Sequence, residues 1–464
     1  MELGFETIGN ATVIAHDGGP VLATDPWFEG DAYFGSWTLS HEVPAEQREA
    51  LLACPYVWVS HGHPDHLSGD SLALLKDKTV LVPNHFGHRI RDDLMAQGYR
   101  VQVMEDRTWM QLSPRVRAMC IPDVNQDAVL LIDVGGTLVV NLNDASDRGW
   151  GRFVRGIIRA YPKSFLLALS GYGDADMINY FTEDGRRIPP PAAQRTPVGQ
   201  TIARQAELYG VKYFVPFSSM HKYQRADSAW AGQYTTTLQD YPRGFASRTV
   251  ELLPAFIRYD CAKEQLEEIH PKERDIVARP PADFGDDWSE RLEPGEPEAL
   301  ERYFRQVRHL ERSLDYLRFQ VGGQEHVITF RKDHFHKGIT FEVPRHSLMT
   351  AVRYEIFDDL LIGNFMKTTL HGPFGERGLY PDFTPYVAKY SDNGRARTAE
   401  EVDAYFDVYR ARDPLGFLRH RLEANYLLPL QQKSANTLRR ALRPDSSAYR
   451  RAKDLYWGVR RTLL

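Results

Sequence analysis

The sequence predicts an α/β fold, and two observations lead to this prediction. Short apolar runs of strand length, such as Tyr56 to Ser60 (YVWVS) and Thr79 to Pro83 (TVLVP), alternate with stretches that have helical periodicity. The chain has 464 residues, enough for two or three structural units with a large core. This alternating order is typical of α/β proteins.

The N-terminal part predicts the start of a sheet followed by a helix. Residues Phe5 to Phe28 alternate apolar and polar side chains, turn at HDGGP and continue as VLATDPWF, so we expect a β-hairpin. The stretch PAEQREALLA, which begins at Pro44, predicts a helix before the strand Tyr56 to Ser60. The polar sequence HGHPDHLSGD then follows directly where that strand ends.

Further strands and helices are expected up to about residue 280. A helix is expected from Arg89 to Gly98, and strands around Arg115 to Ile121, Ala128 to Val134 and Thr137 to Leu142. The stretch Pro197 to Tyr209 predicts a helix that ends at Gly210 and leads to the strand KYFVPF, because Pro in the first turn and Gly after the last are typical helix boundaries.

A stretch rich in Pro, Gly and acidic residues predicts a division of the chain after about residue 280. We expect one domain over residues 1–280, an acidic linker or exposed connection over 281–297, and a mixed α+β extension over 298–464. In the extension we expect a helix from Glu298 to Phe319, strands in HVITFRK and KGITFEVP, and a helical C-terminus.

Composition narrows the classes of function. Lys and Arg total 57 against 62 Asp and Glu, so a net charge of −5 argues against nucleic-acid binding. No apolar run reaches the length of about 18 residues that a transmembrane helix needs, and the first residues do not resemble a signal peptide. The three cysteines are widely spaced, without a disulfide or iron–sulfur pattern. We therefore expect a cytoplasmic protein in a reducing compartment.

The six residues from His61 to His66 (HGHPDH) indicate a metal site. They place three imidazoles and the carboxylate of Asp65 directly after an apolar strand, a ligand set that suits a borderline divalent ion or non-haem iron. His61 and His63 alternate along the loop and can point to one side, while Asp65 and His66 could serve a second ion. The alternative is a polar surface loop whose histidines cap the following helix.

This pattern resembles a known superfamily. HxHxDH after a strand is the signature of the metallo-β-lactamase superfamily, and Thr24 to Trp27 (TDPW) is similar to an early aspartate motif of its lactonase-like branch. The resemblance implies an α/β fold of the αββα sandwich type, with one or two metal ions at its edge. Asp25 would then support a metal-bound histidine or its loop, in place of binding metal directly.

A closer resemblance is to CMP-N-acetylneuraminate hydroxylases. It is based on VSHGHPDHL, LVPN, QDAVLLIDVGGTLVVNLNDASDRGWGR and KYFVPFSSMHKY, and continues more faintly through RYEIFDDLLIGNFMKT and VDAYFDVYRARDP. That family carries a Rieske domain before this region, whereas here strands are expected within a few residues of Met1 and no CxH…CxxH pattern occurs. The electrons for such a reaction would therefore come from an external donor.

The resemblance also implies a ligand set for two metal ions. Asp123 stands where the family usually has a third histidine, so His61, His63 and Asp123 would form a two-histidine, one-carboxylate face that favours Fe over Zn or Mn. Asn125 and Asp127 are alternatives to Asp123, which could also be a turn residue. The second ion would be bound by the following residues: Asp65, His66 and His221. Asp144 would bridge the ions, and Asp144 and Asp123 would be the catalytic carboxylates.

Two functions remain open from the sequence. The first is a diiron oxygenase that hydroxylates or oxidises a polar small molecule, for example a sugar- or nucleotide-linked one, with O2 and a ferredoxin-type electron donor. The alternative is a dinuclear metal-dependent hydrolase of the lactonase or phosphodiesterase type. Residues 413–464 carry 11 Lys and Arg against 4 Asp and Glu, a pattern that predicts a basic amphipathic helix. It could pack on the enzyme or dock an acidic partner such as a ferredoxin.

Overall fold

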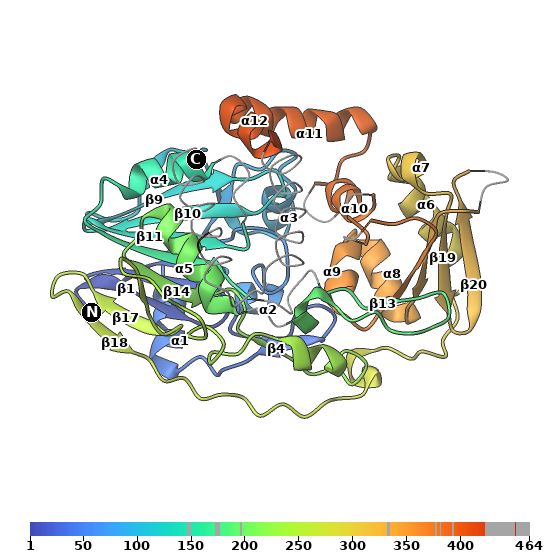
Figure 1. Ribbon diagram of the computed structural model, residues 1–464, viewed down its shortest axis with the longest axis horizontal. Coiled ribbons are helices and arrows are strands. Elements are labelled where there is room, and N and C mark those ends of the chain that lie inside the picture. Colours follow the sequence, from blue (N-terminus) through green and yellow to red (C-terminus); the bar gives the residue numbers. More distant parts are fainter. Residues whose placement is uncertain are drawn as a thin grey trace.

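Two large sheets packed face to face form the body of the protein, and a smaller sheet with its helices lies beside them (Figure 1). The computed structural model describes residues 1–145, 150–171, 177–194, 197–331, 335–375, 378–380, 382–391, 394–422 and 451. Helices flank the two large sheets on their outer sides, which confirms the predicted α/β fold and gives a four-layer αββα sandwich.

The first sheet has eight strands in the order β18-β17-β1-β2-β3-β5-β6-β7. Their bounds are β1 Leu3–Ile8, β2 Thr12–Asp17, β3 Pro20–Thr24, β5 Tyr56–Trp58, β6 Thr79–Pro83, β7 Arg100–Met104, β17 Ile257–Asp260 and β18 Gln265–Glu268. Strands β3, β5, β6 and β7 run parallel to one another. The residues that follow β3, β5 and β6 therefore emerge at the same edge of the sheet.

The second sheet has seven strands in the order β16-β14-β12-β11-β10-β9-β8. Their bounds are β8 Trp109–Gln111, β9 Val116–Pro122, β10 Ala128–Val134, β11 Thr137–Asn143, β12 Lys163–Leu169, β14 Tyr213–Phe217 and β16 Glu251–Leu252. Strands β11, β12 and β14 are parallel, and β9 has the same direction because β10 is antiparallel to both β9 and β11. The ends of β9, β11 and β14 thus also share one edge.

Apolar side chains from both sheets fill the space between them. The ring of Phe5 on β1 meets the ring of Phe165 on β12 edge to face, with 4.9 Å between centroids. Strand β10 is buried along its whole length, which explains its almost continuous apolar sequence AVLLIDV. Its side chains alternate: Leu130 and Ile132 join the cluster shared by the two sheets, and Val129 and Leu131 join a second cluster.

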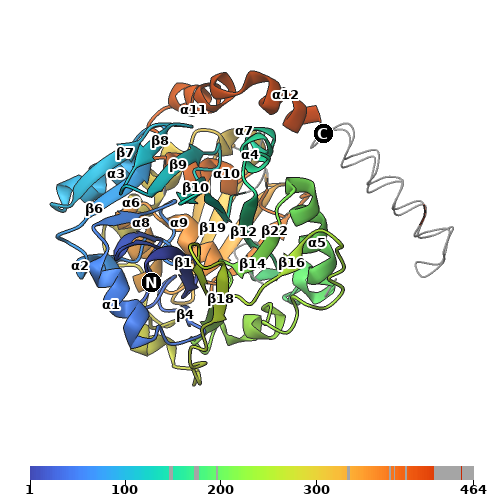
Figure 2. The same ribbon diagram turned by 90° about the vertical axis from the view of Figure 1, so that its left-hand side faces the viewer.

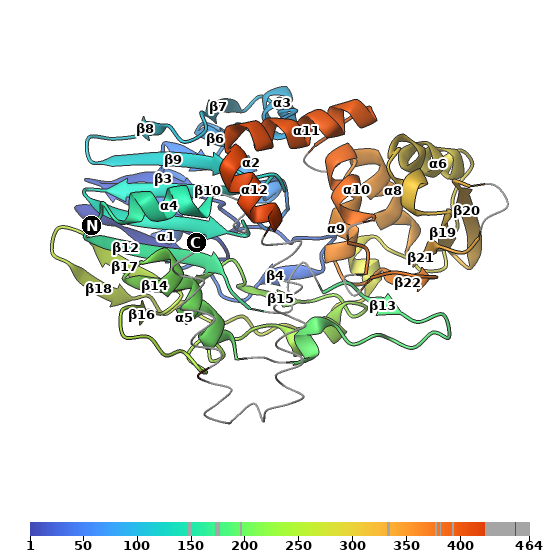
Figure 3. The same ribbon diagram turned by 45° about the horizontal axis from the view of Figure 1, so that its top comes forward.

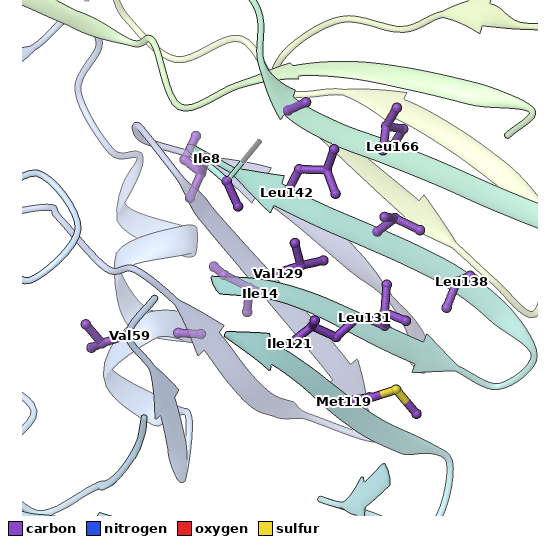
Figure 4. Packing of buried hydrophobic residues seen from close by; sticks show 14 of the residues in the cluster. Ile8, Ile14, Val59, Met119, Ile121, Val129, Leu131, Leu138, Leu142 and Leu166 are labelled. Carbon is purple, nitrogen blue, oxygen red and sulfur yellow. The ribbon is translucent and has the colours of Figure 1, made fainter. Parts of the chain in front are cut away.

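That second cluster connects the sheets to the helices that cover them. Figure 4 shows its side chains on strands of both sheets, among them Leu131 and Leu138. The helices over the sandwich are α1 Ala45–Ala53, α2 Gly69–Ala73, α3 Arg89–Ala96, α4 Gly151–Ile158 and α5 Val198–Tyr209. Each of these helices contributes buried side chains, such as Leu51 of α1 and Ile202 of α5, to the same cluster.

The third sheet belongs mainly to the C-terminal part of the chain (Figure 3). Its order is β13-β22-β21-β19-β20, with β13 Tyr180–Phe181, β19 Tyr316–Val321, β20 Gln324–Thr329, β21 Gly338–Glu342 and β22 Lys367–His371. The nearby helices are α6 Glu296–Gln306, α7 Leu310–Ser313, α8 Arg345–Tyr354, α9 Phe357–Ile362, α10 Thr384–Tyr390, α11 Ala399–Arg412 and α12 Pro414–Leu422. Helix α11 contacts the sandwich, as the His85 Nδ1 to Tyr409 hydroxyl distance of 3.0 Å shows.

Short elements complete the described chain. A two-stranded sheet pairs β4 Trp37–Leu39 with β15 His221–Tyr223. The 3-10 helices are η1 Pro191–Gln194, η2 Ala229–Tyr234 and η3 Pro281–Phe284. Among the residues that the structure describes, no helix has both the length and the apolar character needed to cross a membrane.

Two predicted elements are wrong in detail. The helix expected from Glu298 to Phe319 ends at Gln306, and its last residues form strand β19, because Gly322 and Gly323 adopt positive φ and turn the chain into the β19–β20 hairpin. The run expected to form one strand before HDGGP is interrupted by a turn at Gly9 and Asn10, so the hairpin is a three-stranded meander.

The division of the chain at 281–297 stays a prediction, although two observations concern it. Strand β13, from the part before 280, pairs with β22 in the third sheet. Asp286 within the expected connection is 2% exposed, whereas most of its neighbours are exposed. Most of the basic segment 413–464 lies outside the described residues.

A buried ion pair joins the sandwich side to the C-terminal part. Arg225, which follows β15, is fully buried and donates to the Asp286 carboxylate at 2.8 Å and to both oxygens of Asp227 at 3.0 Å. Asp286 also accepts hydrogen bonds from the backbone and hydroxyl of Ser347 on α8. The guanidinium of Arg225 lies 3.8 Å from the centre of the Phe365 ring.

We expect Arg225→Met to lower the free energy of unfolding by about 3–5 kcal/mol, because it leaves Asp286 buried without its cation. Chemical denaturation measures this loss. Arg243→Met is the matched control, since Arg243 pairs with Asp240 but is 69% exposed, and we expect it to cost less than about 1 kcal/mol. Equal stability of the two variants would contradict the prediction.

Candidate metal centre

The ends of parallel strands from both sheets bring polar side chains to one edge of the sandwich. Asp25 follows β3 and the HGHPDH loop follows β5, while Asp144 follows β11 and Ser218 follows β14. Three non-glycine residues at these strand ends have positive φ: Asp25 at 39°, Asn143 at 36° and Ser218 at 62°. Backbone strain of this kind gathers at functional sites, where the surrounding structure maintains it.

His61 and His63 turn towards each other within the HGHPDH loop. Their Nε2 and Nδ1 atoms are 2.9 Å apart, and Asp144 Oδ2 lies 4.0 Å from His61 Nε2. Ligand atoms of these three residues all lie within 4.8 Å of one another, which is compatible with a shared metal ion. Among the described residues, the structure thus brings together two imidazoles and one carboxylate.

His66 and Asp65 lie near Asp144 as well. His66 Nε2 is 3.4 Å from both Asp65 Oδ2 and Asp144 Oδ2, and its Nδ1 is 3.0 Å from Asp25 Oδ2. Asp25 is fully buried and also accepts a hydrogen bond from the backbone of Ser60 at 2.7 Å. The Asp25 side chain therefore faces His66, and its role as an orienting partner stays a prediction.

The carboxylate of Asp144 lies near both His61 and His66. The Ser218 hydroxyl donates to its Oδ1, and its Oδ2 faces both His61 and His66. The pKa of Asp144 is lowered although burial opposes the shift, because His66 and Ser218 stabilise the charged form. The role of Asp144 as a bridging ligand stays a prediction.

His221 is buried at the start of β15. Its ring stacks on Trp37 with 3.5 Å between centroids and 4° between planes. Burial lowers its pKa to about 3, with Asp144 acting in the opposite direction, so its imidazole is neutral, the form that binds metal. Its role as a ligand remains a proposal.

Asp123 is located in a tight turn after β9. Its Oδ1 accepts a hydrogen bond from the backbone of Asn125 at 2.7 Å, and its backbone amide donates to Asp127. The structure groups Asp144, and not Asp123, with His61 and His63. Asp127, an alternative from the sequence, lies closer to the histidines, with its Oδ1 4.0 Å from His61 Nδ1.

Two aspartates from the C-terminal part also reach the site, and sequence reasoning assigned no role to them. Asp358 and Asp359 lie in the first turn of α9 and are 8% and 6% exposed. Asp358 Oδ2 is 3.5 Å from His63 Nε2. The adjacent aspartates in RYEIFDDLLIGN are the sequence signal that could have indicated these residues. Their separation from His63 along the chain, however, does not show that the two segments meet.

Two further residues near the N-terminus, Asn10 and Tyr33, hold the side chain of Asp65 in place. Tyr33 donates its hydroxyl to Asp65 Oδ1 at 2.6 Å, and the Asn10 amide donates to Asp65 Oδ2 at 2.9 Å. Asn10 also accepts hydrogen bonds from the backbones of Ser218 and Met220, so it connects the HGHPDH loop to the loop after β14. The Gly9-Asn10 pair, which is typical of a turn, is the sequence signal that could have indicated Asn10.

Burial and charge act on the imidazoles in different ways. Burial lowers the pKa of His61 well below its ordinary value, and the other histidines add to this shift. Burial opposes protonation of His63 as well, but Asp358 and Asp359 raise its pKa to about 10. For Asp359, burial is the main reason why the pKa rises to about 7.

The donor set fits divalent cations. Among the described residues, the carboxyl groups near the three imidazoles include those of several buried or partly buried residues: Asp25, Asp65, Asp127, Asp144, Asp358 and Asp359. A surplus of acidic groups at a buried position is costly unless cations compensate their charge. His85 is different: its Nε2 lies 3.3 Å from the carbonyl oxygen of Ser60, which indicates a structural role.

The αββα sandwich, with HxHxDH at a strand end on its edge, defines the class as the metallo-β-lactamase fold. No family model matches the chain. The chain is similar to curated proteins named cytidine monophosphate-N-acetylneuraminic acid hydroxylase, which confirms the resemblance read from its motifs.

Three of these relatives show the extent of the similarity. The protein of Asterias rubens is 28% identical over 146 residues, which are 30% of this chain and 22% of the relative. That of Danio rerio is 28% identical over 142 residues, 29% of this chain and 24% of the relative. The Homo sapiens protein, named inactive, is 27% identical over 140 residues, 28% of each. The matched stretch spans about a quarter of each relative.

Solved structures show weaker likeness. A metallo hydrolase from Ignicoccus hospitalis has a TM-score of 0.34 and 16% identity, covering 58% of this chain and 99% of that protein. CmlA, a diiron beta-hydroxylase from Streptomyces venezuelae, has a TM-score of 0.32 and 15% identity, covering 52% of this chain and 48% of that protein. With TM-scores below 0.5, neither likeness bears on the function of this chain.

We expect His63→Ala and Asp65→Ala each to remove bound metal and leave the protein folded, because the ligands bind as a preorganised set. Elemental analysis of the purified variants measures metal, and circular dichroism measures folding. His270→Ala is the control, since His270 is 79% exposed. Wild-type metal content in both site variants would show that these residues are not ligands.

Proposed function

We propose that this protein is a metal-dependent oxygenase that hydroxylates or oxidises a polar small molecule. The observation that supports this most is the grouping of His61, His63 and Asp144. Two histidines and one carboxylate are the ligand set of non-haem Fe(II) oxygenases, and some catalytic zinc sites share it. Similarity to curated hydroxylases over part of the chain supports the same class of reaction.

In this proposal the centre holds two divalent ions, with iron favoured over zinc or manganese. His61, His63 and Asp144 would bind the first ion, and Asp65, His66 and His221 the second, with Asp144 shared by both. When bound, the two ions would supply the binding and reduction of O2, which protein side chains do not provide. Asp123 is left as a turn residue near the centre.

The side chains around the ligands hold them in place and limit access of water. Asp25 orients His66, and Tyr33 and Asn10 orient Asp65 through the contacts given above. His61 is fully buried, so its metal-facing nitrogen is shielded from solvent. Such fixed geometry is the part of the catalysis that the chain itself provides.

Hydroxylation sets the stoichiometry of the reaction. One oxygen atom of O2 enters a C–H or N–H bond of the substrate and the other leaves as water, so each turnover consumes two electrons and two protons. We propose that an external carrier of the ferredoxin type delivers the electrons. The substrate would be a polar molecule, with a sugar nucleotide as the first to test, because the curated relatives are named for one.

We expect protein purified without added metal to contain about two iron ions per chain and to show absorption bands of an oxo-bridged iron pair. Reduction by a chemical reductant should then cause O2 uptake. Elemental analysis, absorption spectroscopy and an oxygen electrode measure these results, with His63→Ala as the inactive control. A colourless zinc or manganese protein that hydrolyses esters or phosphodiesters would instead establish the hydrolase alternative.

The electron donor can be tested through the charge of residues 413–464, which carry 11 Lys and Arg against 4 Asp and Glu. We expect ferredoxin-supported turnover to fall as salt rises, because the screening length drops from about 10 Å at 0.1 M to about 3 Å at 1 M. Deleting residues 446–464 should reduce this turnover and spare turnover with a chemical reductant. Salt-independent turnover, or equal loss with both electron sources, would contradict docking by this segment.

A further inference from the structure

We propose that Asp358 on α9 is a positioning residue that orients His63 for metal binding. The inference rests on the proposed metal centre and adds a residue from outside the β-sandwich to it. Nothing in the HGHPDH motif indicates this partner, because it lies almost 300 residues further along the chain.

The two nitrogens of His63 face different partners. Nδ1 lies 2.9 Å from His61 Nε2, on the side where the proposed ligand atoms meet, and Nε2 lies 3.5 Å from Asp358 Oδ2. A metal-bound imidazole usually donates its other N–H to a carboxylate, a carbonyl or water, which fixes the tautomer and the ring orientation. Asp358 is placed to accept that hydrogen bond from Nε2.

The other two histidines of the motif show the same arrangement. His66 directs Nε2 towards Asp65 and Asp144, and its Nδ1 lies 3.0 Å from Asp25. His61 directs Nε2 towards Asp144, and its Nδ1 lies 2.9 Å from the Ser60 hydroxyl. Each imidazole therefore has one nitrogen towards the centre and an oxygen partner at the other, and Asp358 supplies this partner for His63.

Contacts with residues before 280 hold α9 at both ends. Before the helix, the Arg89 guanidinium donates to the carbonyl oxygens of Tyr354 at 2.6 Å and Glu355 at 2.8 Å. After it, Ser36 donates to the carbonyl oxygen of Gly363 at 2.6 Å, and the Trp230 indole donates to that of Asn364 at 3.0 Å. These contacts keep Asp358 beside His63, so the fold itself fixes the position of Asp358.

The test measures metal affinity of the metal-free protein, and does not depend on oxygenase activity. Zn2+ and Co2+ are titrated against a competing chelator into the wild type and into Asp358→Ala, Asp358→Leu and Asp358→Glu. Asp358→Leu removes the carboxylate without leaving the cavity that Asp358→Ala leaves, so it remains informative if Asp358→Ala does not fold. Asp403→Asn is the control, because Asp403 is an exposed carboxylate on α11.

We expect Asp358→Ala and Asp358→Leu to bind metal about 10–100-fold more weakly, with an altered visible spectrum of bound Co2+. Asp358→Glu should recover part of the affinity, since it restores a carboxylate. Circular dichroism and the unfolding temperature of the metal-free forms check that the variants are folded.

Wild-type affinity and wild-type Co2+ spectra in folded Asp358→Ala or Asp358→Leu would overturn this inference alone. Wild-type affinity in His63→Ala would instead overturn the proposed metal centre. The failure of the positioning role and the failure of the centre can thus be distinguished.

Discussion

The edge of the sandwich has to accommodate several acidic side chains beside three imidazoles at a largely buried position. Asp25 is fully buried, and Asp358 and Asp359 are 8% and 6% exposed. Such carboxyl groups are stable in a low-dielectric site only when protons, hydrogen-bond donors or cations compensate their charge. The raised pKa of His63 and the hydrogen bonds to Asp65 are partial compensation, and bound divalent ions would complete it.

The fold meets this requirement by ending parallel strands at one edge. Strands of the first sheet lead to Asp25 and the histidine loop, and strands of the second lead to Asp144 and Ser218. The apolar layer between the sheets, with Phe5 against Phe165, holds the two sets of strand ends at a constant separation. Strained backbone at Asp25, Asn143 and Ser218 is maintained by that packing.

The C-terminal part is connected to this edge by more than chain continuity. Figure 2 shows α11 and α12 over one end of the sandwich, and α9 lies where Asp358 meets His63. The buried contact between Arg225 and Asp286 fixes the same two parts farther along the interface. The C-terminal part therefore brings a carboxylate, that of Asp358, to the histidine loop of the sandwich.

Local sequence determined the features that depend on neighbours along the chain. The apolar run of β10 predicted a buried strand, and the density of histidines in HGHPDH indicated a metal site, because both signals are contained in a few consecutive residues. The helix ending at Gln306 and the turn at Asn10 were missed, since competing glycine turns outweighed apolar periodicity. Only the tertiary structure decided that Asp144 groups with His61 and His63, and that Asp358 reaches His63. Those contacts join residues far apart in sequence, and the packing of two sheets and α9 sets them.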